Sequence, residues 1–274
     1  MDAVDAFLAD MKADIDCDSV DATVAYVAGN SEPFRFTDEQ AGRELETDAI
    51  RARIEASILN LSPETEALKP KEISPKVYRV ELENATVLRA RVIVPLSGSA
   101  AAQENAALAA VQFQGARIEP GESLSFNQTV GMRTEESGYT AAEEPAYGQN
   151  IVGVGGGVCQ VSTALYRLAL LGGLEIAERS AAVYPVDYCE IGQEAAVSDQ
   201  GLDLVLTNNT DAPLFLVVRV YAENDGQTME WQLIGKENES RFSLVSEVET
   251  IDAPEEPVYV RDSEGRYATY ADER

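Results

Sequence analysis

The chain has 274 residues, of which 45% are hydrophobic, enough to bury one large core or two modest ones in a globular protein of one to three domains. Its formal net charge of -27 disfavours binding to nucleic acid or to an anionic membrane surface, because like charges repel. The chain contains no histidine, the commonest zinc ligand and the commonest general base. We therefore expect no nucleic-acid partner, no bound metal and no cofactor.

The N-terminal region predicts a small α+β module over residues 1–76. Apolar residues at helical spacing predict a helix over residues 3–13, and residues 22–28 have the pattern of a short strand. A second helix is predicted to begin near residue 47, because isoleucines recur at four-residue spacing, and a strand follows over residues 68–73. We assign these elements to one module.

The next segment alternates β-branched and polar residues. Residues 77–96 predict two strands or one long strand, and we assign residues 77–101 as connecting strands. A helix over residues 102–113 follows, and SLSFN, residues 123–127, returns as a strand.

The run GVGGGVCQVSTALY leads from a glycine-rich turn into a helix predicted over residues 158–171. Glycines leave room for the backbone of a ligand, and the N-terminus of the helix would stabilise a thiolate at Cys159. This is the environment of a cysteine nucleophile, but a free cysteine is also a common buried apolar residue. The ligand-binding candidates in this run are Gly155, Gly156, Gly157, Gln160 and Ser162.

The C-terminal half predicts an antiparallel sheet that packs on this helix. The predicted strands cover residues 175–178, 183–188, 195–198, 202–207, 214–221 and 229–233. Residues 237–274 are acidic and contain proline, which is typical of an extension or linker.

Catalysis by Cys159 would require a proton acceptor, and the chain offers no histidine. Glu194 and Asp187 are the candidate orienting acids, although a carboxyl with a pKa of about 4 matches a thiol of about 8.5 poorly. We therefore favour a role without catalysis and keep cysteine-dependent hydrolysis or acyl transfer as the alternative. A disulfide between Cys159 and Cys189 is a further alternative.

Other polar residues could line the same cleft. Arg133 could clamp a ligand carboxylate, with Ser125 and Asn127 beside it, although Asn127 could instead cap a turn. Several tyrosines could stack on a sugar or lie in half-buried sheets, namely Tyr139, Tyr147, Tyr166, Tyr184 and Tyr188.

Three stretches, PGESLSFNQTVGMRTEESGYTAA, GVGGGVCQVSTALYRLALLGGLEIAER and GLDLVLTNNTDAPLFL, resemble the VanW family of Gram-positive cell-envelope proteins, named from glycopeptide-resistance gene clusters. We assign residues 102–236 to a VanW-like domain. The module over residues 1–76 resembles the peptidoglycan-binding module that often precedes it. The resemblance implies an extracellular protein at the cell envelope, a membrane anchor outside this chain, and peptidoglycan or a wall peptide as its ligand.

The chain departs from the family pattern after the cysteine helix. Relatives commonly read Glu-Arg-His-x-His, whereas Ser180, Ala181 and Ala182 follow Glu178 and Arg179 here. Relatives often have Arg-Asp where this chain has Gln-Glu at residues 193–194. The sequence thus predicts an α+β protein whose cysteine-bearing helix packs on an antiparallel sheet, with a binding or scaffolding role.

Overall fold

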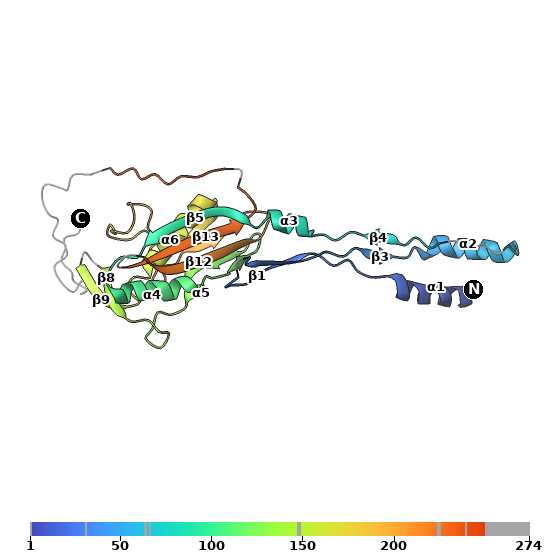
Figure 1. The fold of residues 1–274 in the computed structure, drawn as a ribbon, viewed down its shortest axis with the longest axis horizontal. Helices are drawn as coiled ribbons and strands as arrows, with labels where there is room; N and C mark the ends of the chain where they lie inside the picture. Colours follow the sequence, from blue (N-terminus) through green and yellow to red (C-terminus); the bar gives the residue numbers. More distant parts are fainter. Residues whose placement is uncertain are drawn as a thin grey trace, which may run out of the picture. The chain divides into compact units, whose positions relative to one another are not determined.

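The computed structural model describes residues 2–30, 32–62, 65, 67–146, 149–223, 226–238 and 240–249. The chain divides into two units, Met1–Leu244 and Val245–Arg274, and all helices and strands named below belong to the first. Helices and antiparallel sheets coexist in it, which confirms the predicted α+β class (Figure 1). Most of the predicted extension, residue 239 and residues 250–274, lies outside the described residues.

The N-terminal elements are two helices and two small strand pairs. Helix α1 (Asp2–Ile15) contacts α2 (Thr47–Leu59), and both confirm predicted helices. Strand β1 (Thr23–Tyr26) pairs with β2 (Phe34–Thr37), and β3 (Gly42–Glu44) pairs with β4 (Lys71–Ile73).

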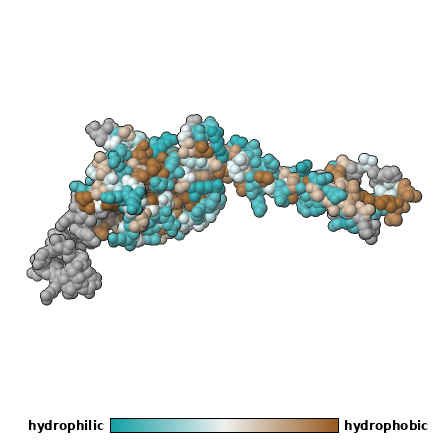
Figure 2. All heavy atoms as spheres, turned by 90° about the horizontal axis from the view of Figure 1, so that it is seen from below, coloured by the Kyte–Doolittle hydropathy of each residue, from teal (hydrophilic) through white to brown (hydrophobic). Residues whose placement is uncertain are grey.

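Helix α2 has no buried residue, and Figure 2 shows hydrophobic surface around it. The exposed apolar side chains there are Phe7, Ile58, Leu59, Leu61 and Leu68. All of them except Leu59 line a groove of about 1070 Å³ between α1 and α2.

The first half of the predicted connecting strands is wrong, because Arg79–Asn84 forms helix α3. The Glu81 carboxylate accepts from the Tyr78 N–H at 3.2 Å and caps the helix, and Arg79 bonds Glu83 one turn later at 2.8 Å. Val80, which the alternating pattern would bury, is exposed. The second half is strand β5 (Val87–Pro95), as predicted.

The main sheet has the strand order β5-β13-β12-β6, with all neighbours antiparallel. Its strands are β6 (Arg117–Ile118), β12 (Leu214–Glu223) and β13 (Gly226–Gly235), with β5 at one edge. On one face, Phe215 of β12 contacts Phe34 of β2, with ring centroids 5.3 Å apart. This contact and its apolar neighbours join the β1–β2 pair to the sheet.

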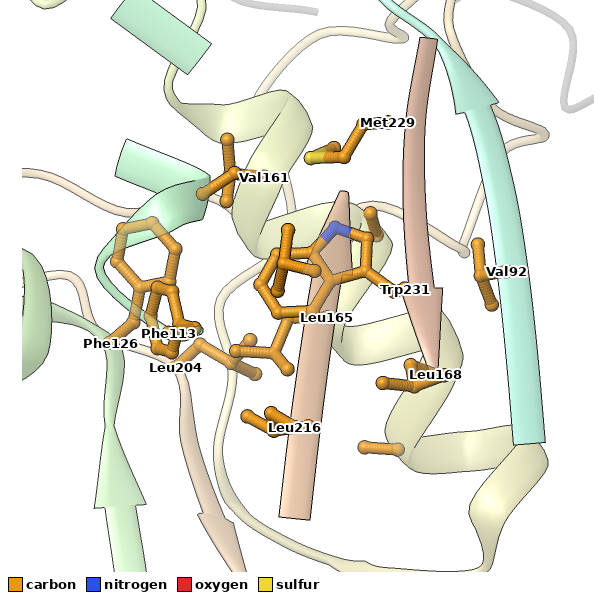
Figure 3. Close-up of a cluster of buried hydrophobic side chains, with 14 of the residues drawn as sticks. Val92, Phe113, Phe126, Val161, Leu165, Leu168, Leu204, Leu216, Met229 and Trp231 are labelled. Atoms are coloured by element: carbon orange, nitrogen blue, oxygen red, sulfur yellow. The ribbon is translucent and has the colours of Figure 1, made fainter. Parts of the chain in front are cut away.

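The other face of the sheet is covered by helices α4 (Ala100–Val111) and α6 (Cys159–Gly172). Figure 3 shows Leu165 and Leu168 of α6 beside Trp231 of β13, and Trp231 is fully buried. The Phe113 ring lies 5.5 Å from Trp231. Burial of each such leucine contributes about 1.5–3 kcal/mol, so the core fixes α6 against the sheet as predicted.

A second sheet has the order β10-β11-β7, formed by β7 (Ser123–Ser125), β10 (Glu175–Glu178) and β11 (Val205–Thr207). The short helix α5 (Phe126–Val130) follows β7. The sequence analysis missed the hairpin of β8 (Ala141–Ala146) and β9 (Gln149–Val154), which leads into the glycine turn.

The strands predicted over residues 183–188 and 195–198 are wrong. The chain from residue 181 to residue 204 is irregular except for one bridge between Ser180 and Ala196. Side chains of α6 explain this at Ala195, because Ser162 donates to its carbonyl at 2.6 Å and Thr163 accepts from its N–H at 3.1 Å. These side chains take the place of a neighbouring strand. Within the described residues, no helix is both long and apolar enough to cross a membrane.

Candidate functional site

The glycine turn before α6 is filled by the protein's own backbone. Gly155 and Gly157 have positive φ angles of 84° and 100°. A Cβ on Gly156 would lie 2.6 Å from the carbonyl oxygen of Ala142, and one on Gly155 would lie 2.8 Å from Arg133 Cβ. Glycine is therefore required by close packing at this turn, and contact of these glycines with a ligand stays a prediction.

Asn105, on α4, holds the turn in place. Its Nδ2 donates to the carbonyls of Thr140 at 2.8 Å and Gly156 at 3.0 Å, and its Oδ1 accepts from the Thr140 N–H at 2.9 Å. The side chain is buried. The amide thus ties the glycine turn to the start of β8.

The amides at the start of α6 are directed back into the same turn. The N–H groups of Gln160 and Val161 donate to the carbonyls of Gly157 at 3.1 Å and Val158 at 2.9 Å. The Gln160 side chain is buried and pairs with the Ser97 backbone, accepting at 2.8 Å and donating at 3.2 Å. These groups therefore hold the turn and the end of β5 together.

Cys159, the first residue of α6, is partly buried, and its Sγ donates to the carbonyl oxygen of Val197 at 3.5 Å. A carbonyl oxygen accepts a hydrogen bond from a thiol, whereas it would repel the negative charge of a thiolate. The geometry thus suits the neutral thiol.

Tyr188 lies close to Cys159 from the irregular segment. Burial raises the pKa of its phenol, the Cys159 sulfur adds to this rise, and a hydrogen bond with Thr163 opposes it. Ser162 also faces this segment, through its bond to Ala195, and donates weakly to the Cys159 carbonyl at 3.1 Å. The segment from Tyr188 to Val197 therefore lies over the first turns of α6.

The two candidate acids lie in different surroundings. The Glu194 carboxylate is buried, and one oxygen lies 3.2 Å from Arg179 Nη2 while the other accepts from the Gly192 N–H at 2.7 Å. Arg179 also donates to the Glu194 carbonyl at 2.8 Å. Asp187 is exposed. The Glu194 carboxylate is thus engaged with its own loop and Arg179.

Arg133, Asn127 and Ser125 come together in one polar network. Arg133 is buried, its Nε lies 2.8 Å from Asp199 Oδ1, and its Nη1 donates to Asn127 Oδ1 at 2.7 Å. Ser125 Oγ donates to Asp203 at 2.5 Å and accepts from the Gln128 N–H, which caps α5. The Arg133 charge is balanced internally, and its role as a clamp stays a prediction.

All three cysteines are free, so Cys159 and Cys189 do not form a disulfide. Burial raises the pKa of the Cys189 thiol, and the Glu194 charge adds to the rise. Cys189 lines an open pocket of about 510 Å³. The other residues that line it are Arg167, Asp187, Tyr188, Glu190, Gln193 and Leu244.

Sequence reasoning missed Arg167 and Thr163. Cys159, Thr163 and Arg167 recur at four-residue spacing, which places them along one side of α6. This spacing was the available signal. Of the tyrosines, Tyr139 is buried, Tyr184 is exposed, Tyr166 lies under the Arg179 guanidinium, and Tyr147 lies outside the described residues. Within the described ranges, no group of three or more acidic, cysteine or histidine side chains could hold a metal ion.

Comparison with known proteins identifies the domain that carries this site. Residues 101–232 match the model of the family described as VanW like protein. The chain is 35% identical over 125 residues to the uncharacterized protein YoaR of Bacillus subtilis (strain 168), covering 46% of this chain and 41% of YoaR.

The chain is also 33% identical over 112 residues to the vancomycin B-type resistance protein VanW of Enterococcus faecalis (strain ATCC 700802 / V583). That match covers 39% of this chain and 41% of the relative, so the chain spans about two fifths of the length of both relatives. No solved structure matches. Residues 101–232, slightly less than half of this chain, therefore form a VanW-like domain.

Proposed function

We propose that this chain is an extracellular cell-envelope protein that binds peptidoglycan or a wall peptide, and that Cys159 does not act as a nucleophile. The observation that carries the second part is the hydrogen bond from the Cys159 thiol to the Val197 carbonyl, in a chain without histidine. A cysteine nucleophile needs a nearby base or a stabilised thiolate. The Val197 carbonyl supplies neither.

Two further features support a binding role over catalysis. The N–H groups of Gln160 and Val161, which could stabilise a developing oxyanion, already bond the carbonyls of the glycine turn. The Glu194 carboxylate, the predicted orienting acid, is engaged with Arg179 and Gly192. A cysteine-dependent hydrolase or acyl transferase is therefore not favoured.

The cell-envelope part of the proposal rests on the family. One relative is named as a vancomycin B-type resistance protein, and the VanW-like domain implies a place at the envelope. The net charge of -27 makes adsorption to anionic wall polymers unfavourable, so binding would have to be specific.

Cosedimentation with purified Gram-positive peptidoglycan tests the proposal. We expect the wild-type chain to be retained, and Cys159→Ala to be retained equally, since the thiol does not react. A heat-denatured wild-type sample controls for non-specific trapping of unfolded chain. Absence of retained protein would contradict the binding role. Release of soluble fragments that Cys159→Ala abolishes would support the hydrolase instead.

A further inference from the structure

The pocket beside Cys189 is lined by an arginine, Arg167, with one N–H group that no protein acceptor satisfies. The Nε–H of Arg167 is buried and has no hydrogen-bond acceptor among the residues that the structure describes. A guanidinium group carries five N–H donors and no acceptor, and a buried charged donor without a partner is costly. In a chain with 48 acidic residues and 21 basic ones, a buried arginine Nε–H without an acceptor is unusual.

The position of Arg167 is fixed by the fold. Its neighbours on α6, Leu165 and Leu168, are fully buried against the main sheet, so the helix cannot rotate and the half-buried Arg167 stays at the pocket. Arg167 lines the pocket of about 510 Å³, a volume in the range that small ligands occupy. Its charge also acts on the Cys189 thiol at the pocket wall. The missing acceptor is therefore expected inside the pocket.

The pocket also presents carboxylates of its own. Asp187 is exposed and lines the same pocket. Glu190, the second acid of the lining, is also exposed, and one of its oxygens accepts a hydrogen bond from Gln193 Nε2 at 3.0 Å. Tyr188, between these two acids in the sequence, also lines the pocket. The pocket thus combines one cationic side chain, two exposed carboxylates and a tyrosine.

We propose that this pocket binds a small ligand that carries a carboxylate and an amine, such as an amino acid or a short peptide. The carboxylate supplies the acceptor that Arg167 lacks, and the amine meets Asp187. An inorganic anion would satisfy Arg167 but would be repelled by Asp187 and Glu190. The proposal goes beyond peptidoglycan binding, because it concerns free ligand in a pocket that Cys159 does not line.

Isothermal titration calorimetry with millimolar glycylglycine and alanine tests the site. Propionate and propylamine serve as probes with the carboxylate alone and the amine alone. We expect glycylglycine or alanine to bind the wild-type chain, and each single-charge probe to bind about tenfold more weakly, since each lacks one ion pair. Arg167→Met should lose at least about tenfold in affinity, and Asp187→Asn should weaken glycylglycine more than propionate.

A stability measurement separates this role from a structural one. Arg167→Met keeps the apolar stem and removes the unsatisfied donor, so its melting temperature should equal or exceed that of the wild type. Arg35→Met, at an exposed position on β2, makes the same change of charge away from the pocket and should leave binding unchanged. The proposal is overturned if neither glycylglycine nor alanine binds the wild-type chain, or if Arg167→Met binds as tightly as the wild type. Retention on peptidoglycan without binding of these probes would overturn this inference and leave the proposed function standing.

Discussion

Replacement of Asn105 by alanine should loosen the glycine turn, because this one amide makes one backbone hydrogen bond to Gly156 in the turn and two to Thr140. The change leaves the carbonyls of Thr140 and Gly156 and the N–H of Thr140 without their partner. Thr140 is exposed, so water can replace Asn105 at its two groups at a cost of about 0.5–1 kcal/mol each. Gly156 is buried, and its unsatisfied carbonyl costs about 1–3 kcal/mol. Asn105→Ala should therefore lower the free energy of unfolding by about 2–5 kcal/mol.

Urea denaturation, followed by tryptophan fluorescence, measures this difference. Trp231 is the chain's one tryptophan and is buried in the core on which α4 and α6 pack, so its emission reports on this domain. Glu104→Ala, at an exposed position of the same helix, is the control and should change the free energy by less than about 0.5 kcal/mol. The reasoning is refuted if Asn105→Ala also stays within about 0.5 kcal/mol of the wild type.

Three other changes give separate tests. Asp199→Ala should lower the free energy of unfolding in urea by roughly 3 kcal/mol, since it leaves the Arg133 charge buried without its ion pair. Asp211→Ala is the control: it breaks an exposed ion pair of equal length with Lys236 and should lower the free energy of unfolding by at most about 1 kcal/mol. Ser162→Ala should cost about 1–2 kcal/mol, because the buried Ala195 carbonyl loses its donor, and a cost near zero would argue that water replaces it. Burial raises the pKa of the Cys189 thiol above its value in the unfolded chain, so ionisation of the unfolded chain lowers the stability of the fold as the pH rises above ~8.5. Above that pH the melting temperature should fall less steeply in Cys189→Ala than in the wild type. Parallel curves for the two proteins would contradict the assignment.

Local patterns predicted the helices of the core but failed where side chains replaced regular pairing. Helix α6 was predictable because a glycine-rich turn precedes it and its apolar residues recur at helical spacing. Helix α3 was not, because alternation at residues 77–82 resembles a strand while the bond between Glu81 and the Tyr78 N–H favours a helix. The strands predicted over residues 183–188 and 195–198 are absent because side chains of Ser162, Thr163 and Arg179 bond the backbone of this region, and no local pattern in the sequence shows these contacts.

In the candidate site, too, residues that are close in sequence were predicted together, whereas their partners farther along the chain were not. Ser125, Asn127 and Arg133 were found together because they lie in one short motif. Their partners Asp199 and Asp203 lie about 70 residues later and have no spacing that connects them to it. The pocket at Cys189 depends on α6 meeting an irregular loop, which no periodicity can express. Only the four-residue spacing of Cys159, Thr163 and Arg167 pointed to a shared side of the helix.

The chemical state of Cys159 is the point on which the account depends. The most direct test is the rate of iodoacetamide labelling at neutral pH in a variant with Cys17→Ser and Cys189→Ser, in which Cys159 is the remaining thiol. A thiol that is partly buried and donates to Val197 should react more slowly in the native chain than in the urea-unfolded chain. Labelling that is faster in the native chain than in the unfolded one would show an activated thiolate and contradict the account.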